Sequence, residues 1–224
     1  MIGTPRVHHR LTDSTNQRAR ELALQGAPHG TLVTADEQTA GRGRQGRTWI
    51  APPGEALLLS VVLRALDELL PLRAAVAVAE SLPVPAQIKW PNDVWVEGRK
   101  VSGILVEGRP QEGWAVLGIG LNVSTTEFPP ELTEIATSLA LAAGSAPSRA
   151  EVLDALLDSL ERLLAAPAAE VLAAWRERDA LLGAEVAWAG GRGTAAGVTD
   201  AGALRVKTPS GTVELDAGEV HLER

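Results

Sequence analysis

The chain has 224 residues, 45% of them hydrophobic, no cysteine and a formal net charge of −7. Its length accommodates one catalytic domain and a small module, and the lack of cysteine excludes a disulfide framework, a zinc–thiolate site and a cysteine nucleophile. The acidic total argues against a general nucleic-acid binder, and the absence of a signal peptide or of a run near the roughly 18 apolar residues of a membrane span predicts a cytoplasmic protein without a membrane partner.

Hydrophobic periodicity predicts an α+β chain. Closely spaced apolar runs separated by glycine-containing turns, from residue 87 to residue 121, predict a meander and therefore a mixed, mostly antiparallel sheet flanked by helices. Strands are expected at 7–11, 31–36, 56–64, 87–89, 94–97, 101–107 and 114–121, and helices at 16–25, 71–81, 148–164 and 168–182.

The character of the sequence changes after Leu182, where short strands alternate with turns. This predicts a domain boundary that separates a catalytic domain, residues 1–182, from a small β-domain, residues 183–224. A unit of about 40 residues is near the lower limit for independent stability, so we expect it to rest on the larger domain.

Residues 41–49 read GRGRQGRTW and predict an irregular loop that holds an anion. Its glycines allow the backbone to approach a ligand, and Arg42, Arg44 and Arg47 add forked donors that suit carboxylate or phosphate. Taken alone, such a run is more often a solvated turn or a nucleic-acid patch than an anion site.

A second motif, KWPND at residues 89–93, stands between two predicted strands. Lys89 directly precedes a tryptophan and a proline, and a lysine ammonium is costly to bury unless an anion meets it. The alternative is that Lys89 extends to solvent and Trp90 is plain core.

A third motif, Ser14-Thr15-Asn16, lies where the first helix is predicted to begin. A serine or threonine here is an ordinary N-cap, but hydroxyls and amides at a helix N-terminus also suit a polar or anionic ligand group. Both interpretations are compatible.

In their order, these motifs resemble the bacterial biotin protein ligases, also called biotin–acetyl-CoA-carboxylase ligases. The resemblance rests on Ser14-Thr15-Asn16, on Gln38 ahead of the loop at 41–47, on KWPND, and on the GILVE and GIGLN segments at 103–107 and 118–122. It implies a catalytic domain like that of class II aminoacyl-tRNA synthetases, followed by a C-terminal SH3-like barrel. Only thirteen residues precede Ser14, so we expect a monofunctional enzyme without a DNA-binding domain or a DNA partner.

The resemblance implies that ATP, with Mg²⁺, converts biotin to biotinyl-5′-adenylate, and that biotin then passes to a lysine of the biotin carboxyl carrier protein. Lipoate–protein ligase activity and a non-enzymatic role in binding biotin or a nucleotide are the alternatives. Some relatives pair through a sheet edge, and the sequence leaves open whether this chain forms a homodimer.

The family's ligand contacts, carried over position by position, imply eight residues of the site, and we add Trp49, Gly103 and Asn122 as candidates. The polar helix start and Gln38 would hold the neutral ureido ring, Arg42, Arg44 and Lys89 would be catalytic and meet carboxylate and phosphate, and Gly103 would leave space beside the biotin bicycle. We expect the loop to be mobile until an anion binds. The four histidines show no metal-ligand spacing. The eight family positions are Ser14, Thr15, Asn16, Gln38, Arg42, Gly43, Arg44 and Lys89. The three added candidates are Trp49 as a face for adenine, Gly103, and Asn122 as a ligand for Mg²⁺ or phosphate.

Overall fold

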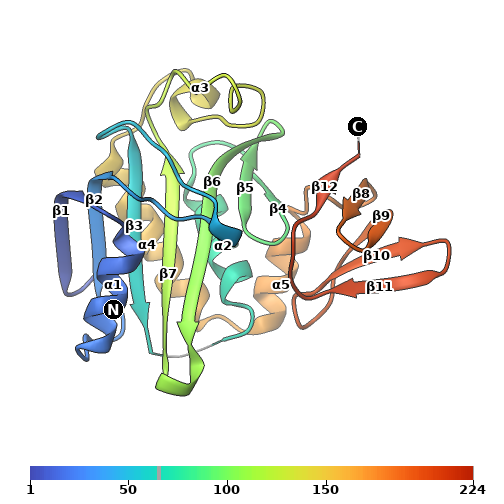
Figure 1. The fold of residues 1–224 in the computed structure, drawn as a ribbon, viewed down its shortest axis with the longest axis horizontal. Helices are drawn as coiled ribbons and strands as arrows, with labels where there is room; N and C mark the ends of the chain where they lie inside the picture. Colours follow the sequence, from blue (N-terminus) through green and yellow to red (C-terminus); the bar gives the residue numbers. More distant parts are fainter. Residues whose placement is uncertain (65–66, 224) are drawn as a thin grey trace.

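The apolar runs form two β-sheets in a computed structural model that describes residues 1–64 and 67–223 (Figure 1). The larger sheet contains β1 (Arg6–Thr12), β2 (Leu32–Gln38), β3 (Ala56–Leu63), β4 (Gln87–Lys89), β5 (Asp93–Val96), β6 (Arg99–Arg109) and β7 (Trp114–Asn122). The smaller sheet contains β8 (Glu185–Trp188), β9 (Gly191–Val198), β10 (Leu204–Thr208), β11 (Gly211–Leu215) and β12 (His221–Leu222). The helices are α1 (Thr15–Leu24), α2 (Leu70–Ser81), α3 (Leu139–Ala143), α4 (Arg149–Ala165) and α5 (Ala168–Arg176).

The larger sheet has the strand order β1-β2-β3-β7-β6-β5-β4. Its strands β1 and β2 pair in parallel, and its other neighbouring strands pair antiparallel. The smaller sheet has the order β11-β10-β9-β8-β12, and its strands pair antiparallel. The predicted α+β class, with a mixed and mostly antiparallel sheet and a small β-unit at the C-terminal end, is confirmed.

Helices cover both faces of the larger sheet. Successive strand residues point to opposite faces, so Val61 packs in the main core whereas Val62 packs in a second cluster with Ala19 and Ala23 of α1. Helices α2 and α4 pack against each other in the main core. Helix α1 therefore packs its apolar residues on the face opposite the main core, and its N-terminal residue Asn16 lies against Ser60 of β3 and Gly118 of β7.

The prediction for the last helix of the catalytic region, 168–182, is too long. Helix α5 ends at Arg176 because the following backbone pairs with β4: the amide of Ile88 donates to the carbonyl of Arg178 at 2.7 Å, and the amide of Ala180 donates to the carbonyl of Ile88 at 3.0 Å. After Arg176, backbone pairing with β4 therefore outweighs the local helical periodicity. Two short elements, α3 and β12, were not predicted.

The smaller sheet packs against the larger unit, and Val198, Leu204 and Val206 belong to the same apolar cluster as Leu72. The indole Nε1 of Trp90 also donates to the carbonyl of Gly202 at 3.0 Å. The first strand of the smaller sheet begins at Glu185, close to the predicted domain boundary at 182/183. The boundary itself stays a prediction. The last residue of the predicted C-terminal domain, 224, lies outside the described residues. Within the described ranges, no helix has the length and apolarity needed to span a bilayer.

Candidate ligand cleft

A cleft lies over the centre of the larger sheet, where β3, β7 and β6 are neighbours. The Arg/Gly loop, residues 41–49, covers it, and the KWPND turn at 89–93 forms one wall. Residues 218–221, which lead from the link after β11 into the start of β12, close it from the C-terminal unit. All the predicted site residues except Asn16 and Asn122 line it: Ser14, Thr15, Gln38, Arg42, Gly43, Arg44, Trp49, Lys89 and Gly103.

The Arg/Gly loop is more regular than predicted. The amide of Gly43 donates to the carbonyl of Arg47 at 2.7 Å, and the amide of Trp49 donates to the carbonyl of Gly41 at 3.0 Å. These bonds enclose a 3₁₀ turn over Arg44–Gly46 in which Gln45 has φ +54°. The segment lies outside the strands and α-helices, as predicted, and these bonds close it into a narrow hairpin; its predicted mobility stays a prediction.

The three arginines of the loop have different partners. Arg42 pairs with Glu107 of β6 at 2.9 Å, and Arg47 pairs with Glu219 of the C-terminal unit. Arg44 instead donates to two neutral acceptors, Oδ1 of Asn92 at 3.0 Å and the carbonyl of Gly218 at 3.4 Å. Burial lowers the pKa of the Arg44 guanidinium, although Asp93 and Glu219 oppose this effect.

Lys89 lies at the end of β4, half-buried, with its ammonium 5.4 Å from the ring centre of Trp95. Burial lowers the pKa of Lys89, and this outweighs the opposing effect of the nearby Asp93 carboxylate. Asp93 itself pairs with Lys100, whose Nζ lies 2.7 Å from Oδ1. Lys89 has no ion-pair partner among the described residues, so its ammonium is the cation of this wall that is left without a direct carboxylate contact.

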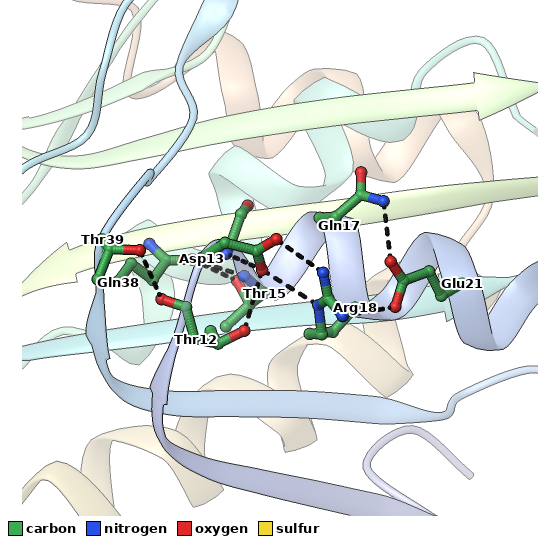
Figure 2. Close-up of polar contacts among 9 residues, drawn as sticks. Thr12, Asp13, Thr15, Gln17, Arg18, Glu21, Gln38 and Thr39 are labelled. Atoms are coloured by element: carbon green, nitrogen blue, oxygen red, sulfur yellow. Dashed lines mark hydrogen bonds and ion pairs between the residues drawn. The ribbon is translucent and has the colours of Figure 1, made fainter.

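The inner end of the cleft is a hydrogen-bonded chain that starts at α1. The amide and hydroxyl of Thr15 donate to Oε1 of Gln38 at 2.7 and 3.1 Å, as Figure 2 shows. The buried hydroxyl of Ser60 lies 2.8 Å from the Thr15 hydroxyl and 2.6 Å from Oδ1 of Asn16. Ser14 occupies the N-cap position without making a capping bond from its side chain, so its hydroxyl is available to a ligand.

Glycines on β6 and β7 make room for the side chains that cross the sheet. Gly103 and Gly120 are register partners, and a Cβ built on Gly120 would lie 2.5 Å from the Trp49 ring. A Cβ on Gly103 would lie 3.0 Å from the same ring and 3.1 Å from Lys100. The space beside Gly103, which we expected to lie beside the biotin bicycle, is occupied by Trp49 and Lys100 in this structure.

Asn122 lies apart from the cleft. Its buried side chain donates to the carbonyl of Thr137 at 3.0 Å, and it lines a different cavity together with Ile50 and Phe128. The structure therefore does not bring Asn122 to the cations of the cleft.

Several residues of the cleft could not be found from their local sequence. Lys100 reaches it only through the register of the β5–β6 hairpin, and Glu219 only because the C-terminal unit folds back. Ser60 had a usable signal, because it is a single polar residue inside the apolar run ALLLSVVL. Glu107 belongs to the GILVE motif, but nothing in that motif indicates its partner.

Two known families match the chain: the Biotin/lipoate A/B protein ligase family over residues 8–124, and the Biotin protein ligase C terminal domain over residues 190–222. The chain belongs to the biotin protein ligase family. A Mycobacterium tuberculosis biotin--[acetyl-CoA-carboxylase] ligase is 36% identical over 93% of this chain and 85% of that protein. The biotin protein ligase of Aquifex aeolicus, solved with biotin and ATP, has 31% identity and a TM-score of 0.87, with 99% of both chains covered.

The bifunctional ligase/repressor BirA of Bacillus subtilis is 41% identical over 72% of this chain, and the match spans 54% of that relative. The chain therefore covers about half the length of this bifunctional relative. The family predicted from the ordered motifs is confirmed.

Proposed function

We propose that this chain is a biotin protein ligase that activates biotin with ATP and transfers it to a lysine of the biotin carboxyl carrier protein. In the first step an oxygen of the biotin carboxylate attacks the α-phosphorus of ATP, biotinyl-5′-adenylate forms and pyrophosphate leaves. In the second step the ε-amine of the acceptor lysine attacks the carbonyl carbon, AMP leaves and the amine loses a proton.

One observation carries the proposal: two half-buried cations of the cleft have no carboxylate partner among the described residues. Arg42, Arg47 and Lys100 are each paired with a carboxylate, whereas Arg44 and Lys89 have no ion pair among the described residues. Burial also lowers the pKa of these two residues. A desolvated, unpaired cation gains most when an anion arrives, so Arg44 and Lys89 are the groups that would meet the biotin carboxylate and the α-phosphate.

The remaining polar groups suit the neutral part of biotin. The Ser14 hydroxyl, Thr15 and Gln38 line the cleft, and together they offer donors and acceptors to a ureido ring. Trp49 is half-buried and lines the cleft with its ring against Gly103 and Gly120, and we assign it to the adenine or the biotin bicycle.

The described residues do not form a resident Mg²⁺ site. They contain no group of three His, Cys, Asp or Glu side chains placed to hold a metal ion, and Asp93, Glu107 and Glu219 are all paired with cations. Mg²⁺ in proteins is commonly held by one or two carboxylates and by substrate phosphates. In this proposal it accompanies the phosphates of ATP, and no step of the mechanism depends on a protein-bound ion.

The test is the exchange of labelled pyrophosphate into ATP, measured with biotin and, separately, with lipoate. We expect exchange with biotin, reduced about a hundredfold or more in Lys89→Ala and Arg44→Ala because each variant removes a cation at the developing charge. Arg205→Ala, which removes an exposed cation of β10, is the matched control. Transfer of labelled biotin to a purified carrier protein would then test the second step.

The alternatives give different results in the same assay. Exchange with lipoate but not biotin would make the chain a lipoate ligase, and exchange with neither acid would leave a binding function. Unchanged exchange in both variants would show that the unpaired cations are not the reaction site.

A further inference from the structure

A single carboxylate joins the Arg/Gly loop to the start of α1. Oε1 of Glu107 pairs with the Arg42 guanidinium at 2.9 Å, and its Oε2 accepts a hydrogen bond from Nδ2 of Asn16 at 2.8 Å. Arg42 and Asn16 are 26 positions apart in the chain, and within the described contacts Glu107 is the side chain that bridges them.

The other end of the Asn16 amide is also fixed. Its Oδ1 lies 2.6 Å from the buried Ser60 hydroxyl, which in turn contacts Thr15. A hydroxyl on one side and a carboxylate on the other allow only one orientation of the amide, since Nδ2 must face the carboxylate. Gly118 lies directly beneath, where a Cβ would overlap Oδ1 of Asn16.

We propose that Glu107 is a positioning residue that fixes Arg42 relative to the polar chain of Asn16, Ser60 and Thr15. Glu107 would thereby position two parts of the site at once: Arg42, which would meet the carboxylate or phosphate, and the polar chain, which would contact the ureido ring. The inference rests on the proposed function, because it names what sets the geometry of that same site.

Electrostatics alone predicts the opposite effect. A negative charge beside an anion-binding cleft weakens the attraction of that cleft for carboxylate and phosphate. If Glu107 acted only through its charge, its removal would tighten the binding of biotin and ATP. If it acts by position, its removal weakens binding, so the sign of the change separates the two roles.

The test is Glu107→Gln, which keeps the size of the side chain. The glutamine oxygen can still accept from Asn16, but its amide nitrogen is a donor and faces the donors of Arg42. The Kd for biotin is expected to rise about tenfold in calorimetry, the equivalent of one charge-assisted hydrogen bond. Glu214→Gln, which breaks an exposed Arg–Glu pair in the smaller sheet, is the matched control and is expected to leave Kd unchanged.

A second measurement does not depend on the proposed activity. In the ligand-free variant, the backbone amides of Gly43 and Trp49, which close the loop hairpin, should exchange with solvent faster than in the wild type, while those of Leu204 and Val206 in β10 should not change. A variant that binds biotin as tightly as the wild type or tighter, or that leaves the loop amides unchanged, would overturn the proposal. If the wild type neither binds biotin nor exchanges pyrophosphate, the proposed function fails, and the amide exchange alone decides the role of Glu107.

Discussion

The glycines of the central strands predict a graded effect of added methyl groups. A Cβ on Gly108 would lie 3.5 Å from the Ala115 side chain, which is ordinary contact, whereas a Cβ on Gly120 would lie 2.5 Å from the Trp49 ring. Alanine is about 0.5–1 kcal/mol better than glycine inside a strand, so Gly108→Ala should leave the free energy of unfolding unchanged or raise it slightly. Gly120→Ala should lower it by about 1–3 kcal/mol, the usual cost of overpacking.

Gly103 and Gly118 complete the series. At Gly103 the close neighbours are the end of Lys100 and the edge of the Trp49 ring, both 3.0–3.1 Å away, so a shift of a few tenths of an ångström relieves the contact. At Gly118 the obstacle is the Asn16 amide, which hydrogen bonds hold on both sides. We therefore expect destabilisation in the order Gly118→Ala, Gly120→Ala, Gly103→Ala and Gly108→Ala, from largest to smallest.

Urea unfolding of the four variants would measure the free energies, and pyrophosphate exchange would measure the site. Gly120→Ala should also lose exchange activity, because Trp49 must leave its place over the sheet, whereas Gly108→Ala should keep it. Equal stability and equal activity of Gly108→Ala and Gly120→Ala would refute the reasoning, since it would show that Trp49 does not occupy this space in solution.

Two further predictions concern buried polar groups. Ser60→Ala removes the hydroxyl partner of Thr15 and of Asn16, so unfolding should cost about 1–3 kcal/mol less than in the wild type, with Ser210→Ala on an exposed turn as control; an unchanged urea midpoint would contradict this. Burial raises the pKa of Asp179 above its ordinary 3.8, so the folded chain binds this proton more tightly than the unfolded chain and loses stability as pH rises through the raised pKa. Asp179→Asn should lack that loss, which appears as a growing stability advantage over the wild type as the pH rises above 3.8 and through the raised pKa; parallel stability curves would contradict the assignment.

The architecture could be predicted where the local pattern and the tertiary packing agree. The β4 strand falls at 87–89 as predicted, and Ser148 caps α4 by accepting a hydrogen bond from the amide of Ala150 at 3.3 Å. The end of α5 could not be predicted, because the segment after Arg176 is helical in composition but pairs with β4. The end of this helix depends on pairing with the edge strand β4, which is distant in the sequence, so the local periodicity does not indicate it.

The candidate site divides in the same way. The types of side chain that line the candidate site could be predicted from the motifs, because the hydroxyl, amide and cationic groups of these motifs match the chemistry of biotin and ATP. Their partners could not, because Glu107, Glu219 and Lys100 enter the site through strand register and through the return of the C-terminal unit. The sequence therefore predicts which groups are present and not which of them are already neutralised.

That distinction changes how the charge of the loop is understood. Three arginines within six residues suggest a strongly cationic patch, but Arg42 and Arg47 each have a carboxylate partner, whereas Arg44 has none in the described part of the chain. The local excess of charge therefore lies on Arg44 and on Lys89 from another strand, which fits one carboxylate and one phosphate better than a polyanion. A chain with a net charge of −7 can hold an anion in this way because the selectivity comes from which cations are left unpaired, not from the total number of cations.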